Sequence, residues 1–211
     1  MPLELAPLTA EDVDAYMAIR QAAFGDNVFR ILFSRPDGPS PEVYAQIRDS
    51  VRDLIANDKH AFFLKVTDTD TGEIIAGAKW KVFRTEKEIL EELELPPPTS
   101  DSDPECWNPF MKLLSDAKKE IMALRPYWML DALSTHPAHH RRGAGAILTQ
   151  WGLERADNEG LETYLEASTM GQPLYEKYGF RPIKTLSFDL GEFGGEGVQE
   201  FQSMVRPKKS S

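Results

Sequence analysis

The chain has 211 residues, of which 41% are hydrophobic and 27% are charged, and its formal net charge is −10. A chain of this length and composition can bury a sizeable core and is typical of a soluble globular protein. The excess of acidic residues argues against binding to nucleic acid or to an anionic membrane surface, because such binding relies on Lys and Arg. The longest apolar runs are too short to span a membrane.

The chain contains one cysteine, Cys106, so an intrachain disulfide is excluded. A lone cysteine suits a reducing compartment. The N-terminus lacks the charged segment followed by an apolar one that a secretory signal requires. We therefore expect a cytoplasmic, intracellular protein. We further expect a single domain over residues 1–211, as a monomer or a homodimer.

The N-terminal part of the sequence predicts a strand followed by two helices. Residues 3–6 alternate as in a strand, and Thr9 with Asp12 forms a capping-box-like start for a helix that Gly25 ends. After a loop-like segment, Ser40 precedes a proline and begins a second helix, which extends to about residue 57.

The middle of the chain predicts a β-hairpin and then an insertion. Residues 61–68 and 74–83 have strand patterns and flank a turn that contains Gly72. Residues 85–126 change character, because an acidic, proline-rich and serine-rich stretch precedes an amphipathic helix at 107–124. This segment is too short to build its own core comfortably, so we interpret it as a helical insertion on the main domain.

In the C-terminal part, strands and helices alternate. A strand, a crossover helix and another strand imply locally parallel pairing, with antiparallel hairpins on either side. The stretch GQPLYEKYGF predicts a short helix with Gly179 as its left-handed cap. The other predicted elements are a strand at 127–135, a helix at 143–158, a strand at 162–168 and two closing strands at 183–190 and 198–205.

The segment HHRRGAGA lies between a predicted strand and a predicted helix. The first amides of a helix lack intrahelical acceptors and point outward near the positive end of the helix dipole. Gly143 and Gly145 let a phosphate approach the backbone closely, and Arg141 and Arg142 add positive charge. These features indicate a diphosphate-binding site. The segment does not fit the dinucleotide-binding fingerprint, because Leu148 occupies the position of the third glycine. It does not fit a P-loop either, because it lacks the tripeptide Gly-Lys-Ser/Thr.

The same segment resembles the acetyl-CoA signature Q/R-x-x-G-x-G/A of the GNAT superfamily of acyl-CoA-dependent N-acyltransferases. HRRGAG reproduces its spacing, with His140 at the Gln/Arg position as a departure from the pattern. LSTHPAHHRRGAGAIL is similar to the family's strand-to-helix entry, and PLYEKYGF to its later LY-x-x-x-GF motif. The resemblance covers residues 127–182. It implies an α+β fold with a mixed, mostly antiparallel central sheet that contains a parallel, splayed strand pair and is flanked by helices.

The resemblance also implies roles for individual residues. In this family the strand before the signature pairs with the pantetheine arm, the loop amides bind the diphosphate, and a tyrosine commonly protonates the departing thiolate. Tyr175 matches that tyrosine, and a neutral phenol (pKa roughly 10) can donate to a nascent thiolate (roughly 8.5). Gln172 could hydrogen-bond the pantetheine. The implied cofactor-binding residues are Leu133, Ser134, Thr135, His140, Arg141, Arg142, Gly143, Ala144, Gly145, Ala146, Gln172 and Tyr175.

The general base is left open between two carboxylates. An attacking ammonium must first lose a proton, so a carboxylate or a water relay is expected. Asp131 and Glu166 lie in the two splayed strands, which leave a wedge between them where the thioester is expected to sit. Each could instead be a structural hydrogen-bond acceptor. His136, His139 and His140 raise the question of a metal. The family needs none, and no cysteine or carboxylate lies at ligand spacing beside them, so we expect no metal site.

The sequence therefore predicts an N-acetyltransferase that uses acetyl-CoA as co-substrate. Its acceptor is expected to be a primary amine of a small molecule or a peptide, which attacks the thioester directly while backbone N–H near Leu133 polarises the carbonyl. The alternative is a catalytically inactive acyl-CoA-binding sensor or scaffold. The insertion at 85–126, with Trp107 and Phe110, is a candidate lid on the acceptor side.

Overall fold

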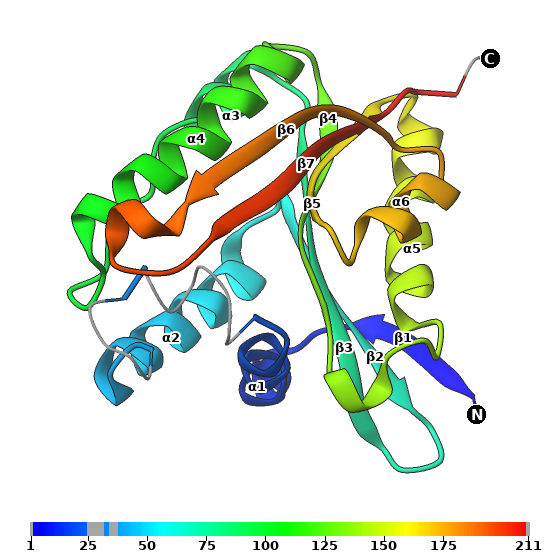
Figure 1. Ribbon diagram of the computed structural model, residues 1–211. Coiled ribbons are helices and arrows are strands. Elements are labelled where there is room, and N and C mark those ends of the chain that lie inside the picture. The colour runs from blue at the N-terminus through cyan, green and yellow to red at the C-terminus, as the bar shows by residue number, and fades with distance from the viewer. Residues whose placement is uncertain (1, 25–31, 34–37, 210–211) are drawn as a thin grey trace.

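The structure is a computed structural model that describes residues 2–24, 32–33 and 38–209. It contains a seven-stranded sheet in the order β1-β2-β3-β4-β5-β7-β6 (Figure 1). Neighbouring strands are antiparallel except β4 and β5, which are parallel. This mixed, mostly antiparallel sheet confirms the predicted fold class. The strands are β1 (Leu3–Pro7), β2 (Ala61–Asp68), β3 (Glu73–Phe83), β4 (Tyr127–Thr135), β5 (Glu162–Ser168), β6 (Arg181–Asp189) and β7 (Val198–Arg206).

Helices cover both faces of the sheet. Helices α5 and α6 lie on one face, and α1, α2, α3 and α4 lie on the other (Figure 1). None of the helices in the described ranges is long and apolar enough to cross a membrane. The helices are α1 (Val13–Phe24), α2 (Pro41–Asn57), α3 (Glu86–Glu92), α4 (Pro104–Met122), α5 (Ala144–Glu159) and α6 (Gln172–Lys177).

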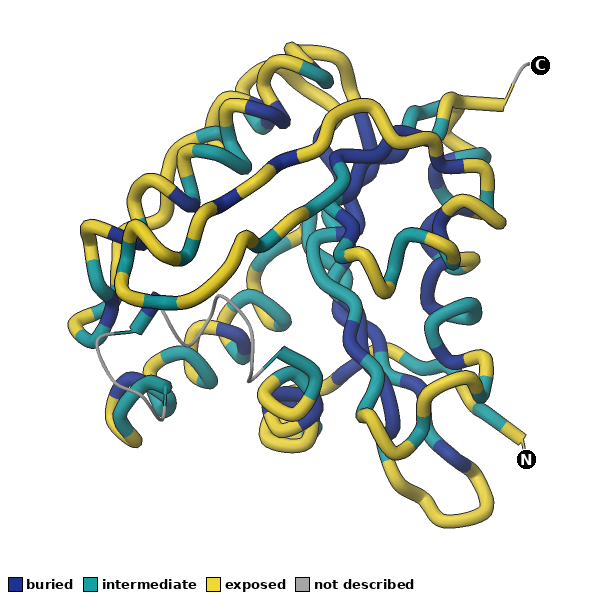
Figure 2. The backbone as a smooth tube through the Cα atoms, viewed as in Figure 1, coloured by how far each residue is buried: buried dark blue, intermediate teal, exposed yellow. Residues whose placement is uncertain are grey.

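The core lies along the central strands and the inner side of α5, where Figure 2 shows the longest runs of buried chain. Trp80 of β3 and Trp128 of β4 are fully buried there. The Trp80 indole donates a hydrogen bond to the Leu148 carbonyl of α5 at 3.1 Å. Gly152 permits this close approach, because a Cβ at that position would lie 2.3 Å from the Trp80 ring.

Local capping signals place the helix boundaries where the sequence predicts them. Thr9 and Asp12 form the capping box before α1, and the Ser40 hydroxyl accepts from the Val43 amide at the start of α2. Gly179 adopts the predicted left-handed conformation after α6, with φ of 87°. The predicted end of the first helix at Gly25 lies outside the described residues.

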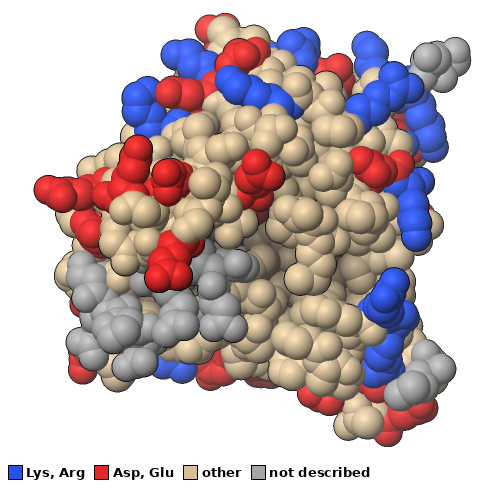
Figure 3. Space-filling view, in the orientation of Figure 1, with Lys and Arg blue, Asp and Glu red and all other residues tan. Residues whose placement is uncertain are grey.

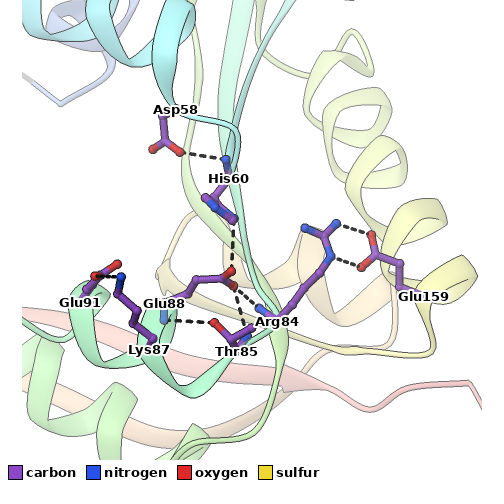
Figure 4. A network of polar contacts seen from close by, with 8 residues as sticks. All are labelled: Asp58, His60, Arg84, Thr85, Lys87, Glu88, Glu91 and Glu159. Atoms are coloured by element: carbon purple, nitrogen blue, oxygen red, sulfur yellow. Dashed lines mark hydrogen bonds and ion pairs between the residues drawn. The ribbon is translucent and has the colours of Figure 1, made fainter.

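The insertion between β3 and β4 contains two helices rather than the single predicted one. Helix α3 begins with a capping box formed by Thr85 and Glu88. The sequence prediction missed this helix because the segment is rich in acidic residues. Glu88 also accepts from the Arg84 amide, and the Arg84 guanidinium binds both oxygens of Glu159 at 2.8 Å (Figure 4). These contacts tie the start of the insertion to the C-terminal end of α5.

The parallel strands β4 and β5 pair only over part of their length. Their register runs from Tyr127 with Glu162 to Leu130 with Leu165. Beyond that point β4 continues to pair with β3, and β5 with β7. Asp131 is an extra residue in β4, since Lys79 and Trp80 of β3 pair with residues on either side of it. A bulge bends and twists a strand locally, so Asp131 marks the point where β4 leaves β5 and a wedge opens.

Candidate active site

A cradle of free backbone amides lies at the start of α5. Gly143 has φ of 95° and precedes the first helical residue, Ala144. Within the described chain, none of the amides of residues 141–146 donates to a protein acceptor. A Cβ on Gly143 would meet no atom within 4 Å, whereas one on Gly145 would lie 3.2 Å from Leu174. The structure thus brings the predicted diphosphate-binding amides together at a helix N-terminus, where an anion is favoured.

The two arginines of this loop have different environments. Arg141 is exposed and adopts a left-handed φ of 62°, a conformation that side chains with a Cβ rarely occupy. Arg142 instead directs its guanidinium to Asp68 at 2.7 Å and to Nδ1 of His139 at 2.9 Å. Its side-chain charge is therefore already paired, and only its amide is part of the cradle.

Each of the three clustered histidines has its own hydrogen-bonding partner. Nδ1 of His136 accepts from the Ala138 amide at 3.3 Å. His139 links Arg142 to Glu73, and Nε2 of His140 lies 3.1 Å from the Thr135 carbonyl oxygen. No group of three or more metal-binding side chains occurs among the residues that the structure describes.

The open edge of β4 lies at the mouth of the wedge. Past Leu130, the backbone of β4 that faces β5 has no strand partner in the described structure. This stretch includes Leu133, Ser134 and Thr135, which were predicted to pair with pantetheine, and the buried Ser134 hydroxyl has no partner within the described residues. Figure 3 shows that the surface between α1 and α6 is hollowed and carries mostly uncharged side chains.

Tyr175 lies on α6, beside the wedge. It is buried and belongs to the same apolar cluster as Ala144 of α5 and Ala167 of β5. Burial raises the pKa of its hydroxyl above the ordinary value, so the phenol stays protonated at neutral pH. Gln172, one turn earlier, donates to Glu176 of the same helix at 2.8 Å.

The two candidate bases lie on the opposite face, under the insertion, in different environments. Burial tends to raise the pKa of Asp131, but the ammonium groups of Lys79, Lys81 and Lys118 outweigh it and hold that pKa below the usual range. Burial also raises the pKa of the Glu166 carboxyl, and there Lys118 offsets the effect only in part. One Glu166 oxygen is buried with no partner in the described part of the chain.

A ladder of ion pairs connects this face to the insertion. Lys79 contacts Asp131 at 3.1 Å, Lys81 contacts Asp131 at 3.8 Å and Glu92 at 2.7 Å, and Lys118 contacts Glu92 at 3.0 Å. We call these five residues the charge ladder. The sequence contains a pattern that indicates the charge ladder. Lys79 and Lys81 lie at alternate positions of the otherwise apolar β3, and Lys118 lies among the buried residues of α4.

Solved structures that share this architecture include acetyltransferases. A Corynebacterium glutamicum protein described as a histone acetyltransferase and related acetyltransferase is 21% identical, with a TM-score of 0.63 and coverage of 100% of this chain and 99% of the other. The polyamine N-acetyltransferase of Drosophila melanogaster, which forms N-acetylagmatine, is 14% identical, with a TM-score of 0.67 and coverage of 97% of this chain and 99% of the other. A Sinorhizobium meliloti phosphinothricin acetyltransferase in complex with acetyl-CoA is 14% identical, with a TM-score of 0.59 and coverage of 99% of this chain and 89% of the other.

The sequence comparisons place the chain in a family. No curated protein sequence matches it. The model of the acetyltransferase (GNAT) family matches residues 25–180, which include β2 to β5, the amide cradle and α6. Membership of this family indicates an acyl-transferase enzyme. The chain therefore belongs to the GNAT family of acetyltransferases.

Proposed function

We propose that the protein transfers an acetyl group from acetyl-CoA to a primary amine by direct attack on the thioester. The observation that carries this proposal is the separation of β4 from β5 after Leu130, at the end of β4 that leads into the cradle of residues 141–146. An extended substrate arm can pair with the open strand edge while its anionic end meets the free amides. The known amine acetyltransferases with this fold support the same reaction.

In this proposal the cradle binds the diphosphate of acetyl-CoA and the edge of β4 binds pantetheine. Leu133, Ser134 and Thr135 supply the strand edge. Backbone N–H near Leu133 polarises the thioester carbonyl, because a preorganised donor stabilises the charge that develops on its oxygen. Gln172 contributes to pantetheine binding only if its amide leaves Glu176, to which it donates now.

Glu166 is the proposed general base and Tyr175 the general acid. A base must be ionised and free to accept a proton, and the Glu166 carboxyl, with a raised pKa and an unpartnered oxygen, fits better than the ion-paired Asp131. Glu166 takes a proton from the attacking amine as the N–C bond forms. The C–S bond then breaks, Tyr175 gives its proton to the thiolate, and solvent restores both groups.

The insertion is the proposed wall of the acceptor pocket. Its helix α4 carries the buried Lys118, whose charge acts on Glu166, and its helix α3 carries Glu92 of the charge ladder. The chain is proposed to act as one domain, with this insertion as part of the main fold. The acceptor class is a primary amine on a small molecule or a peptide.

Two measurements test the proposed function. Calorimetry reports acetyl-CoA binding, and thiol release reports transfer to a panel of agmatine, arylalkylamines, polyamines and peptides. The single cysteine, Cys106, is buried and adds little to the thiol signal of the native protein. Release of the CoA thiol that depends on one of the amines supports the proposed acetyltransferase activity. Binding without release across the panel favours the sensor or scaffold, a reading kept open by His140 in the signature. Absence of acetyl-CoA binding overturns both.

A further inference from the structure

Asp68 is a buried carboxylate at the end of β2 that the proposed mechanism does not use. Its Oδ1 accepts from the Asp70 amide at 3.1 Å, and its backbone carbonyl accepts from the Gly72 amide at 2.8 Å. One carboxylate oxygen therefore stabilises the turn of the β2–β3 hairpin. The other, Oδ2, accepts from Arg142 at 2.7 Å, across 74 positions of the sequence.

This contact continues into the loop that carries the cradle. A guanidinium only donates, so Nδ1 of His139 is the acceptor of the second Arg142 bond, and Nε2 of His139 faces Glu73 at 3.4 Å. Asp68 and Glu73 flank the hairpin turn, while His139 lies just before the cradle and Arg142 lies within its first residues. The hairpin therefore holds the loop through two side chains at once.

The loop needs such an anchor because its backbone is unusual. Arg141 and Gly143 both have left-handed φ values, of 62° and 95°, on either side of Arg142. A non-glycine residue in this region is strained and persists only where surrounding contacts enforce it. The Arg142 side chain is the part of this three-residue stretch with side-chain contacts to the rest of the protein in the described structure.

We propose that Asp68 is a positioning residue for the diphosphate half of acetyl-CoA, acting through Arg142 to fix the amide cradle. This inference rests on the proposed function. Simple electrostatics predicts the opposite effect, because a carboxylate near an anion site repels the anion. The contribution of Asp68 is therefore geometric: it orients amides that otherwise sample several conformations.

The variant Asp68→Asn separates these two effects by the direction of the change. It removes a negative charge and replaces the charge-assisted bond to Arg142 with at most a weaker neutral one. A purely electrostatic role therefore predicts tighter acetyl-CoA binding. The positioning role predicts binding about tenfold weaker, since a charge-assisted hydrogen bond that orders the loop is lost. Calorimetry measures the affinity of the variant for acetyl-CoA and for S-acetylpantetheine, which lacks the diphosphate. The affinity for S-acetylpantetheine should stay unchanged, a result that a general loss of structure would not give.

Two further variants keep the test decisive. Glu159→Gln removes a bidentate ion pair of similar length at the far end of α5 and should bind acetyl-CoA as the unaltered protein does (Figure 4). The double variant with Asp68→Asn and Arg142→Met removes both charges of the pair and avoids leaving one unpaired, so it serves if the single variant is poorly folded. It should bind acetyl-CoA as weakly as Asp68→Asn alone.

The outcomes separate this inference from the proposed function. Equal or tighter acetyl-CoA binding by a folded Asp68→Asn protein overturns the positioning role and leaves the proposed function intact. Equal loss for acetyl-CoA and S-acetylpantetheine also overturns it. Failure of the unaltered protein to bind acetyl-CoA overturns the proposed function, and this inference with it.

Discussion

The Asp131 carboxylate lies 3.1 Å from the Lys79 ammonium, and this ion pair gives the two carboxylates of the wedge different chemistry. Asp131 is one member of the charge ladder and is stabilised in its ionised form. Glu166, on the neighbouring strand, has an unpartnered oxygen among the described residues and a carboxyl whose pKa burial raises. Two acidic residues that are equivalent in the sequence pattern are thus separated into a structural group and a candidate proton acceptor.

Replacement of each carboxylate should therefore have a different consequence. Glu166→Gln should lower kcat by about 100-fold or more with little change in melting temperature, because it removes the proton acceptor. Asp131→Asn should lower the free energy of unfolding by up to about 3 kcal/mol, because it breaks a partly buried ion pair and leaves lysine charge uncompensated. Steady-state kinetics and denaturant titration measure the two effects. A large loss of kcat in a stable Asp131→Asn protein would reassign the base to Asp131.

The pH dependence should show the same division. Glu166 must be ionised to accept a proton, and its pKa is raised, so kcat/KM should fall as the pH decreases through a value above 4.5. The folded-state pKa of Asp131 is lowered, so its contribution to stability is complete above its unfolded pKa near 3.8 and disappears as the pH falls through the folded value. Rate profiles at roughly pH 4–9 test the first statement. Melts from about pH 6 down to about pH 2 test the second, because a carboxyl with a lowered pKa is protonated only well below its ordinary value. An acidic limb that persists in Glu166→Gln would contradict the base assignment.

Tyr175→Phe should lower kcat while acetyl-CoA affinity is retained. The hydroxyl makes no hydrogen bond to a described residue, so its removal costs the fold little, whereas the thiolate loses its proton donor. The matched control is Tyr178→Phe on the same side of the fold, which should leave kcat unchanged. Equal kcat for Tyr175→Phe and the unaltered protein would show that solvent, rather than this phenol, protonates the thiolate.

Two glycines, one directly before α5 and one inside it, should respond to alanine in different ways. Gly143→Ala forces a Cβ into a left-handed residue with open space around it, which should cost about 1 kcal/mol of stability and weaken acetyl-CoA binding at the cradle. Gly152→Ala places a Cβ 2.3 Å from the rigid Trp80 ring, which should cost about 3 kcal/mol. Melting curves and calorimetry on both variants distinguish a binding effect from a packing effect. Gly152→Ala with an unchanged melting temperature would show that the core can adjust.

The sequence predicts the elements whose signals are local and misses the contacts that depend on distant residues. Thr9 with Asp12, Ser40 and Gly179 mark helix ends because a cap is formed within a few residues. Thr85 and Glu88 carry the same type of signal, so α3 could also have been predicted.

The pairing of charged groups lies beyond such local signals. The partners of Lys118 and Arg142 come from α3 and β2, and only the fold brings them together. The sequence therefore predicts the parallel strand pair and the cradle. It leaves Asp131 and Glu166 equivalent, because the lysines that distinguish them belong to β3 and α4.

His140 provides the sharpest test of the signature loop. Its Nε2 lies 3.1 Å from the Thr135 carbonyl oxygen, so the ring donates a hydrogen bond that ties the loop to the end of β4. His140→Gln places an amide donor in the same direction and restores the residue type usual in the signature, so acetyl-CoA affinity should hold or improve. His140→Ala removes the donor and should weaken binding several-fold, by about the net value of one hydrogen bond. Calorimetry with acetyl-CoA on the unaltered protein and on both variants measures these affinities. If Gln binds as weakly as Ala, the ring itself contacts the ligand, and His140 belongs to the binding site rather than to its support.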